Sequence, residues 1–530
     1  MTTNILMTYS NKEGLEKLLS HPEFKVDIKP KPTQEELAKI IPDYDGLLIR
    51  SEVKVTKEVL ESARNLKLVV RAGTGVDNID IPTATQKGIV AMNVPGGNTI
   101  SAAEHTIALI LALSRNVPQA YLSLKSGQWK REKFVGTELQ GKTLGLIGLG
   151  RIGKEVAKRA QSFEMKVIAY DPFVTEEYAK TIGVELKSLD EVLAESDYIS
   201  IHTPKNEQTK NLINKETIAK MKQGVRIINC ARGGIVDEKA LIDGLKSGYI
   251  KGAALDVFEK EPLPPDSPLL DPSLENLILT PHLGASTEEA QIKIAQESSE
   301  LIIDFFTKGI IRNAVNMPSV DIETYKKIKP YLELSEAIGS MGSQLIEGGI
   351  QEVEITYAGE IADFNTSILT PALLKGILTP ILDIKVNFVN AGYIAKERGI
   401  KIKEIKTKET ADYTSLINLK LTTDRDGVSI SGTILSHQLP RIVSIKELDV
   451  DIQPEGYMII LENLDRPGII GKVGTLLGEN NINIARMQVG RKKVGGEAIT
   501  IISIDNFASE EILRKISKID GITKVRFVQL

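Results

Sequence analysis

The middle of the chain alternates short apolar runs with amphipathic stretches, and this alternation restricts the possible folds more than any other feature. The apolar runs are TLGLI (143–147), KVIAY (166–170), DYISI (197–201), VRIIN (225–229), GAALD (252–256) and LILT (277–280). In RIGKEVAKRAQSF, which follows the first run, Ile152, Val156 and Ala160 recur at helical spacing. Strands that alternate with helices predict a parallel, doubly wound α/β sheet.

A polar or small residue stands at the end of each predicted strand. These residues are Gly148, Asp171, His202, Cys230 leading to Arg232, Asp256 and His282. In a doubly wound sheet the carboxyl ends of the strands line the ligand crevice. The sequence therefore predicts a functional site along this edge.

The same alternation predicts further domains on either side. Residues 1–97 contain the runs NILMTY, DGLLIR, LKLVVRAG and GIVAMN, which indicate a smaller, flavodoxin-like α/β lobe. The helix pattern after His282 could return the chain to that lobe, so we expect it to comprise 1–97 and 286–315. Residues 98–285 would form the Rossmann-type domain. Residues 316–453 would form an α+β domain, and 454–530 a ferredoxin-like domain with the order strand–helix–strand–strand–helix–strand.

Composition excludes several classes of protein. A single cysteine, Cys230, excludes an internal disulfide and a multi-cysteine metal site, so no metal is expected. The net charge of −4 gives no reason to expect a nucleic-acid partner. No apolar run reaches the roughly 18 residues of a membrane span, and the first residues lack the apolar core of a signal peptide. We expect a cytoplasmic protein without a membrane partner.

The segment GLGRIG (148–153) is the strongest cofactor motif. It follows a predicted strand and opens a predicted helix, which is the context that makes GxGxxG specific for a dinucleotide. The glycines allow the backbone to approach a pyrophosphate, and the helix N-terminus favours the anion. Asp171 ends the next strand and would accept hydrogen bonds from ribose hydroxyls, which favours NAD over NADP. The alternative is a glycine turn beside a surface aspartate.

Three further residues fit oxidation or reduction at a carbon next to a carboxylate. Arg232 would bind the carboxylate, because a guanidinium forms a fixed fork for two oxygens. His282 would move the hydroxyl proton. Glu261 would fix the histidine tautomer and stabilise its charged form.

Other interpretations of these positions stay open. Arg232 could be a surface salt-bridge residue, and Glu259 could exchange roles with Glu261. His282 could be structural, and His202 is a rival base because it also follows a strand. Cys230 could be a nucleophile, although a small apolar residue at a strand end explains it better.

At these motifs the chain resembles the D-2-hydroxyacid dehydrogenases. The resemblance lies in GLGRIG, NCARGG (229–234), VFEKEP (257–262) and TPHLGAST (280–287), in that order, and it covers about residues 1–315. Further stretches resemble the family members that act on 3-phospho-D-glycerate. They are RAGTGVDNID (71–80), GGNTISAAEH (96–105) and GTELQGKTLGLIGLGRIG (136–153).

The C-terminal part extends the resemblance to long-form members. LENLDRPGIIGKVGTLLGENNINIARM (461–487) looks like an ACT domain, which senses small molecules, and residues 320–450 look like the intervening regulatory domain. The ACT pattern implies a serine effector bound by Asn463, Asp465 and Asn483. Related domains often carry a histidine where Asn463 stands. ACT domains commonly pair edge to edge, so the resemblance implies a homodimer or homotetramer.

The resemblance implies NAD-dependent oxidation of 3-phospho-D-glycerate to 3-phosphohydroxypyruvate, the first step of the phosphorylated route to L-serine. It assigns Arg232 to substrate binding, Glu261 to pairing with the histidine and His282 to proton transfer. The implied cofactor residues are Thr74, Gly148, Gly150, Arg151, Ile152, Gly153, Asp171, Thr203, Cys230, Ala231, Arg232, Asp256, His282, Leu283, Gly284 and Ala285. The implied substrate residues are Arg50, Lys54, Arg71 and Arg131 for the phosphate, and Thr74, Gly75, Val76 and Asn98 for the carboxylate.

Rival functions also remain. The first rival is another 2-hydroxyacid dehydrogenase, of the glycerate or lactate type. Such an enzyme would not need a C-terminal sensor domain, and the pair Arg50 and Arg71 favours a phosphorylated substrate over glycerate or lactate. An NAD-sensing interaction protein could use the same fold, because fold alone does not determine function. A regulator that uses only the ACT domain is the third alternative.

Overall fold

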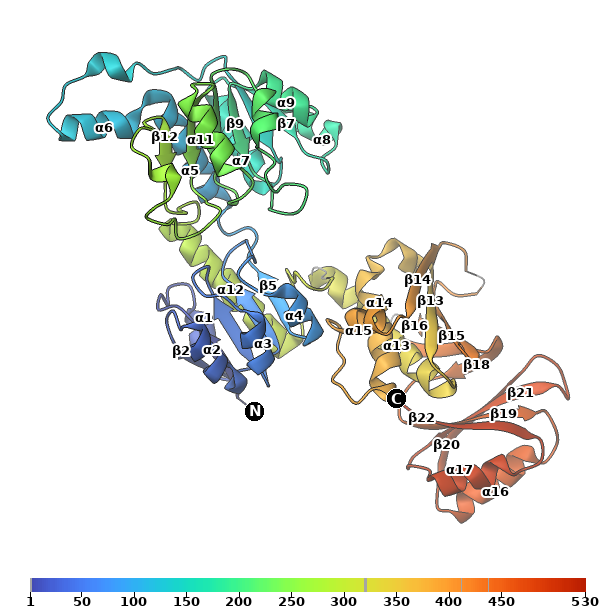
Figure 1. Ribbon diagram of the computed structural model, residues 1–530. Helices are drawn as coiled ribbons and strands as arrows, with labels where there is room; N and C mark the ends of the chain where they lie inside the picture. The colour runs from blue at the N-terminus through green and yellow to red at the C-terminus, as the bar shows by residue number, and fades with distance from the viewer. Residues whose placement is uncertain (1, 319–321, 411, 437) are drawn as a thin grey trace. The chain divides into compact units, whose positions relative to one another are not determined.

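The computed structural model describes residues 2–318, 322–410, 412–436 and 438–530. The chain divides into two compact units, Val94–Glu297 and a second unit that combines Met1–Asn93 with Ser298–Leu530. Figure 1 traces the elements of each unit. The two units are described separately below.

Unit Val94–Glu297 is built on a seven-stranded sheet with the order β12-β11-β10-β9-β6-β7-β8. Its strands are β6 (Thr143–Ile147), β7 (Lys166–Tyr170), β8 (Glu185–Leu186), β9 (Tyr198–Ile201), β10 (Val225–Asn229), β11 (Ile250–Leu255) and β12 (Leu277–Leu279). All of its strand pairs are parallel. The strand order reverses between β6 and β9, which is where doubly wound sheets bind their ligands. The predicted Rossmann-type sheet is confirmed.

Helices cover both faces of this sheet (Figure 1). The helices of the unit are α5 (Thr99–Arg115), α6 (Val117–Lys125), α7 (Arg151–Ser162), α8 (Glu176–Thr181), α9 (Leu189–Glu195), α10 (Lys215–Ala219) and α11 (Glu238–Lys246), with the 3-10 turns η2 (Arg131–Phe134) and η3 (Pro268–Leu270). Of these, α6 projects away from the sheet (Figure 1). One apolar core joins α5 and α7 to the sheet through residues such as Ile110 and Val156. A second core joins α9 and α11 to it through residues such as Leu193 and Leu241.

The first part of the other unit is a five-stranded parallel sheet with the order β2-β1-β3-β4-β5. Its elements are β1 (Thr3–Met7), α1 (Glu16–Leu19), β2 (Phe24–Ile28), α2 (Gln34–Ile40), η1 (Ile41–Asp43), β3 (Gly46–Ile49), α3 (Lys57–Ser62), β4 (Leu68–Arg71), α4 (Ile81–Gln86) and β5 (Val90–Asn93). This order is the flavodoxin-like one that was predicted. Phe306, near the end of α12 (Glu288–Lys308), lies beside Gly46 of β3, so the helix does return to this lobe.

The remainder of this unit starts with a mixed six-stranded sheet, ordered β14-β13-β15-β16-β17-β18. Its strands are β13 (Ile350–Gly359), β14 (Lys401–Thr407), β15 (Ser415–Thr423), β16 (Gly427–Leu435), β17 (Leu439–Ile445) and β18 (Leu448–Ile452). Its helices are α13 (Ile322–Leu345), α14 (Leu369–Leu378), α15 (Ala391–Glu397) and the 3-10 turns η4 (Glu360–Asp363), η5 (Thr366–Ile368) and η6 (Thr379–Ile381). The α+β prediction is confirmed.

The chain ends in an antiparallel four-stranded sheet ordered β20-β21-β19-β22. Its elements follow the predicted order, with β19 (Tyr457–Leu464), α16 (Ile469–Glu479), β20 (Ile484–Arg491), β21 (Glu497–Ile504), α17 (Glu510–Ser517) and β22 (Ile522–Gln529). One sheet face carries Met458, Ile460 and Val528 into the same apolar core as Leu345 of α13. Lys524 and Asp426 also form an ion pair at 2.7 Å across this junction. The C-terminal sheet and the domain before it therefore share one core.

Two strands of the parallel sheets were not predicted. β2 has the sequence FKVDI, in which only Phe24 is buried, and β8 has only two residues, Glu185 and Leu186. Both lie at sheet edges. Within the described ranges, the only helices that reach the length and apolarity of a membrane span are α5 and α6 taken together, and they are bent by 62° at their junction.

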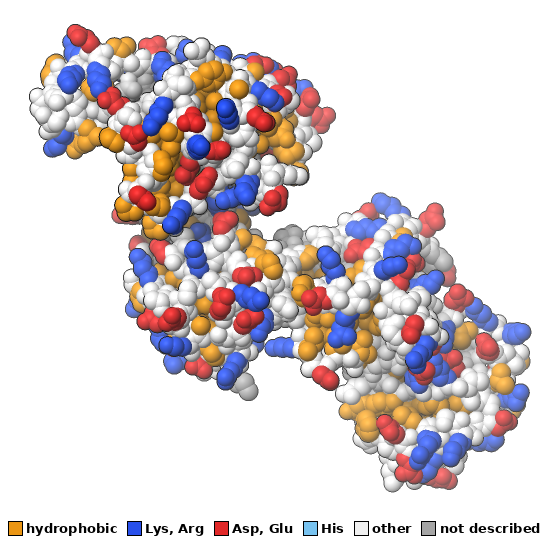
Figure 2. Space-filling model, viewed as in Figure 1, with side chains coloured by type: hydrophobic (Ala, Val, Ile, Leu, Met, Phe, Trp, Pro, Cys, Tyr) orange, Lys and Arg blue, Asp and Glu red, His pale blue; other side chains and the backbone are white. Residues whose placement is uncertain are grey.

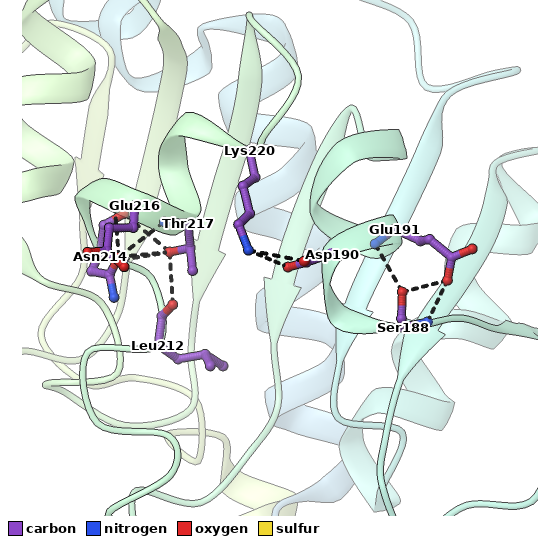
Figure 3. Close-up of polar contacts among 8 residues, drawn as sticks. All are labelled: Ser188, Asp190, Glu191, Leu212, Asn214, Glu216, Thr217 and Lys220. Atoms are coloured by element: carbon purple, nitrogen blue, oxygen red, sulfur yellow. Dashed lines mark hydrogen bonds and ion pairs between the residues drawn. The ribbon is translucent and has the colours of Figure 1, made fainter.

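Side-chain caps fix the start of four helices of the seven-stranded sheet, α8, α9, α10 and α11. Ser188 accepts a hydrogen bond from Glu191 N at 3.3 Å, and the Glu191 carboxylate accepts one from Ser188 N at 2.9 Å (Figure 3). Asn214 caps α10 in the same reciprocal way with Thr217. In the same view Lys220 forms an exposed ion pair with Asp190 at 2.8 Å. The caps accept hydrogen bonds from backbone N–H groups that have no partner within the helix. The ion pair is exposed to solvent and therefore contributes less to stability.

We therefore expect Ser188→Ala to lower the free energy of opening of α9 by about 1 kcal/mol, because it removes an N-cap hydrogen bond. Amide exchange in peptides that cover 189–195, followed by mass spectrometry, should accelerate by about fivefold. Lys220→Ala is the matched control, since an exposed pair contributes between about 0 and 1 kcal/mol. Equal effects of the two substitutions would show that the cap is not the dominant contact.

Candidate functional site

The glycine loop after β6 is shaped by close backbone approaches. Gly148 has φ +101°, and a Cβ there would lie 2.6 Å from the His202 carbonyl oxygen. A Cβ on Gly153 would lie 2.3 Å from the Gly148 carbonyl oxygen. Both positions therefore require glycine, and they bring the first turn of α7 close against the ends of β6 and β9.

Asp171 ties this loop to the end of β7. Its Oδ2 accepts a hydrogen bond from Leu149 N at 2.8 Å, and its Oδ1 accepts one from Phe173 N at 2.9 Å. The carboxylate thus lies directly beside the glycine loop and leaves further lone pairs for hydroxyl donors.

The site fits a dinucleotide in two further respects. A Cβ on Gly150 would meet no described heavy atom within 4 Å, so space is open at the start of α7, where backbone N–H groups favour a phosphate. Thr203 Oγ1, after β9, is buried and has no hydrogen-bond partner among the described residues. A bound ligand group would satisfy it.

His282 and Glu261 are in direct contact. His282 Nδ1 lies 2.7 Å from Glu261 Oε2, and Glu261 Oε1 accepts a hydrogen bond from Phe258 N at 3.0 Å. Burial raises the pKa of the Glu261 carboxyl, but the hydrogen bond and charge of His282 outweigh it, so the pKa lies below its usual value. Glu261 is therefore an ionised partner for the imidazole. Glu259 contacts Glu238 instead, through a backbone hydrogen bond of 2.7 Å.

Arg232 lies in a loop that packs against the loop of Glu261. A Cβ on Gly233 would lie 1.7 Å from the Phe258 carbonyl oxygen, so glycine is required where the two loops touch. Asn229, at the end of β10, holds the turn by accepting from Ala231 N at 3.0 Å and donating to the Arg232 carbonyl at 3.0 Å. Arg232 Nη1 donates to the Ala231 carbonyl at 2.6 Å.

Asp256 occupies a buried position between these loops and the sheet. It is fully buried, and its oxygens accept hydrogen bonds from Leu283 N at 2.8 Å, Gly284 N at 2.9 Å and Thr280 Oγ1 at 2.6 Å. The carboxylate thus anchors the loop that carries His282. Its contact with a cofactor stays a prediction.

The rival residues at the strand ends are differently placed. His202 Nε2 lies 2.9 Å from Ser200 Oγ, and burial lowers the pKa of His202 to about 4. Burial raises the pKa of the Cys230 thiol to about 12, so the thiolate that a nucleophile needs is disfavoured.

Two of the basic residues predicted to bind a phosphate, Arg50 and Arg71, lie at strand ends of the five-stranded sheet. The Arg50 guanidinium, after β3, lies 4.2 Å from the centroid of the Tyr9 ring. Arg71 ends β4 and packs over Gly73. Thr74 follows, and its carbonyl accepts from Asn93 Nδ2 at 2.5 Å. Arg131 lies in η2 of the other unit, where Asn98 precedes α5.

The three predicted effector residues each have a different partner. Asn463 is buried, and its Oδ1 accepts from Thr500 Oγ1 at 2.8 Å. Asp465 pairs with Arg491 and accepts from Gly495 N at 3.0 Å. Asn483 Nδ2 donates to Asp505 Oδ2 at 2.7 Å. Among the described residues, these three side chains form no hydrogen bond with one another, so their shared ligand stays a prediction.

The sequence did not single out two residues of this site. His105 on α5 and Thr280 after β12 both contact the Asp256 carboxylate. The signal that could have identified His105 was its position in GGNTISAAEH, together with the scarcity of histidines in the chain.

Comparison with known proteins places the chain among dehydrogenases. The family model of the D-isomer specific 2-hydroxyacid dehydrogenase NAD-binding domain matches residues 107–284. The D-3-phosphoglycerate dehydrogenase intervening domain matches 327–446, and the ACT domain matches 457–521.

Two relatives match over nearly the whole chain. D-3-phosphoglycerate dehydrogenase of Bacillus subtilis is 49% identical over 488 residues, which are 92% of this chain and 92% of the relative. The enzyme of the same name from Archaeoglobus fulgidus is 46% identical over 98% of this chain and 97% of its own. Among solved structures, D-lactate dehydrogenase from Aquifex aeolicus, complexed with NAD and lactic acid, has a TM-score of 0.53 and 31% identity over 60% of this chain and 100% of its own.

The depressed pKa of His202 predicts a pH-dependent stability of β9. In the unfolded chain this histidine takes a proton below about 6.5, but in the folded unit it does so only below about 4. The unfolded state therefore binds more protons between these values, and stability falls as pH falls through this window. We expect the free energy of opening of β9, from amide exchange corrected for intrinsic pH dependence, to drop between pH 6.5 and 4.5.

His202→Gln is the control for this prediction, because it keeps a polar atom near Ser200 and removes the titration. The variant should lose a distinct part of the pH dependence. An unchanged dependence would show that other groups cause it.

Proposed function

The chain belongs to the family of D-3-phosphoglycerate dehydrogenases, and from this membership we propose that it oxidises 3-phospho-D-glycerate to 3-phosphohydroxypyruvate with NAD. This reaction is the first step of the phosphorylated route to L-serine. The contact of 2.7 Å between His282 Nδ1 and Glu261 Oε2, at the carboxyl edge of a Rossmann-type sheet, carries the proposal.

The residues have distinct tasks in this reaction. The chemistry that bound NAD would supply is acceptance of the hydride, with its electron pair, that leaves substrate C2. His282 takes the proton of the C2 hydroxyl on Nε2, because its Nδ1 is engaged by Glu261. Glu261 stabilises the resulting imidazolium, which its ionised carboxylate suits. Arg232 binds the substrate carboxylate and polarises the C2 oxygen.

The cofactor would lie along the predicted strand-end residues. Three observations support this assignment: the space at Gly150 that no described atom fills, the Asp171 carboxylate beside the loop, and the Thr203 hydroxyl, which has no hydrogen-bond partner among the described residues. Asp171 would favour NAD, because its negative charge repels the 2′-phosphate of NADP. Other predicted cofactor residues belong to the two loops that pack around Asp256 and Phe258. These residues are 230–232 and 282–285.

The proposed substrate contacts form two groups, one for the phosphate and one for the carboxylate of the substrate. Arg50, Lys54 and Arg71, with Arg131, would bind the phosphate. The amides of residues 74–76 and Asn98 would bind the carboxylate. The positions of Arg50 and Arg71 at neighbouring strand ends support a doubly charged anion at this edge, since β3 pairs with β4 in register.

We propose further that the protein acts in the cytoplasm as a homodimer or homotetramer. Each chain would contain the four predicted domains, which are 1–97 with 286–315, 98–285, 316–453 and 454–530. The ACT domain supports binding of a small effector, for which serine is the proposed ligand. Exposed apolar side chains on and after α6, among them Leu122, Trp129 and Val135, support an interface with a second copy. Figure 2 shows hydrophobic side chains on this part of the surface.

The activity is tested by NADH absorbance with 3-phosphoglycerate, glycerate and lactate as separate substrates. We expect turnover of 3-phosphoglycerate to exceed that of the others, and His282→Ala to reduce it by roughly 10²–10⁴ because positioned acid–base catalysis is lost. His21→Ala is the control, because His21 stacks on Phe24 of β2 and is not among the proposed site residues. Absence of NADH formation would contradict the dehydrogenase proposal, and a preference for glycerate or lactate would contradict its substrate.

Effector binding and assembly are tested together. Sedimentation should give a dimer or tetramer, and calorimetric titration with serine should give a saturable heat that Asn483→Ala weakens, because it removes a proposed ligand of the amino acid. Glycine is the control ligand, since it lacks the hydroxyl group. Sedimentation as a monomer would contradict the proposed assembly. Absence of a binding heat with serine would contradict the proposed effector.

A further inference from the structure

We infer that His105 of α5 is a positioning residue that holds the loop of His282 in place through Asp256 and Thr280. The inference rests on the proposed function and adds to it a residue outside the substrate and cofactor contacts. Its basis is a chain of hydrogen bonds that lies within one compact unit and links α5, the end of β11 and the residues after β12.

The contacts around His105 are direct. Its Nε2 lies 3.2 Å from Thr280 Oγ1 and 3.2 Å from Asp256 Oδ1. Thr280 Oγ1 in turn donates to Asp256 Oδ1 at 2.6 Å. The three side chains thus form a closed triangle, and the His105 side chain is 19% exposed.

The hydrogen positions follow from the partners. The Thr280 hydroxyl hydrogen is used on Asp256, so its oxygen acts as an acceptor toward His105. The ionised Asp256 carboxylate can only accept. Nε2 of His105 must therefore carry a hydrogen, and its ring donates into the triangle.

The loop that Asp256 anchors needs this support. His282 has φ +55°, a left-handed conformation that is unfavourable for a non-glycine residue and persists only where the surroundings hold it. The backbone amides of Leu283 and Gly284, which follow it, both donate to Asp256. A buried carboxylate is stable only when its oxygens are supplied with donors, and His105 is the donor that comes from a separate helix.

The next residue of α5 reaches the other catalytic loop. Thr106 hydrogen-bonds the thiol of Cys230, two residues before Arg232. Adjacent residues of one helix therefore contact the loops of both the proposed base and the proposed carboxylate-binding arginine. Displacement of the His282 loop by about 1 Å is enough to reduce turnover by about 10².

The test compares His105→Leu, which removes the donor, with His105→Gln, whose amide N–H can replace Nε2–H. We expect kcat for 3-phosphoglycerate to fall by about 10- to 100-fold in the leucine variant, with KM for NAD nearly unchanged, and to recover at least partly in the glutamine variant. The deuterium isotope effect on kcat with C2-deuterated substrate should rise in His105→Leu, because the chemical step becomes slower.

A second readout does not depend on activity. Amide exchange in peptides that cover 277–290 should accelerate in His105→Leu and return toward the wild-type rate in His105→Gln. Thr280→Val removes the bridging hydroxyl with little change of shape and should act in the same direction if the leucine variant does not fold. Glu104→Ala is the matched control on the same helix, since Glu104 forms only an exposed pair with Arg159 in the described structure.

The outcomes separate this inference from the proposed function. If the wild type forms NADH but His105→Leu matches it in kcat and in loop exchange, the positioning role is wrong. If His105→Gln and His105→Leu lose activity equally and both weaken NAD binding, the residue has only a structural role. A wild type without NADH formation would contradict the proposed function, while the exchange experiment would still decide whether His105 holds the loop.

Discussion

The buried Asp256 carboxylate is the interaction on which the geometry of the site depends. Burial raises its pKa, but hydrogen bonds from His105, Thr280 and Leu283 outweigh that effect and keep it ionised. A charge in such a position requires several donors, and these donors come from α5, from the end of β12 and from the loop backbone. The parallel sheet brings these segments to one edge, and the carboxylate joins them there.

Much of this arrangement could be predicted from the sequence, because the strands of a parallel sheet are apolar on both faces and their ends are marked by polar residues. The predicted run TLGLI is β6, and the predicted run KVIAY is β7, residue for residue. Edge strands carry a weaker signal, since only part of each is buried. This explains why FKVDI at β2 and the two residues of β8 were not predicted.

The structure pairs Glu261, and not Glu259, with His282. The motif alone could not distinguish the two glutamates, because both stand in one short loop. The role of His105 lay beyond sequence reasoning for another reason. Its partners Asp256 and Thr280 are about 150 and 175 residues away in the chain, and one of the two contacts is made by a threonine hydroxyl. Contacts of this kind follow from three-dimensional packing, which no local spacing records.

The apolar core shared by α13 and the C-terminal sheet has a consequence for the last third of the chain. Met458, Ile460 and Val528 pack in one apolar core with Leu345 and its neighbours. Removal of either domain would therefore expose a hydrophobic surface on the other. The two domains must therefore fold and unfold cooperatively. Gln344 of α13 also exchanges two hydrogen bonds of 3.0 Å with the backbone of Gln529 in β22, so any displacement of the C-terminal sheet would be transmitted to α13.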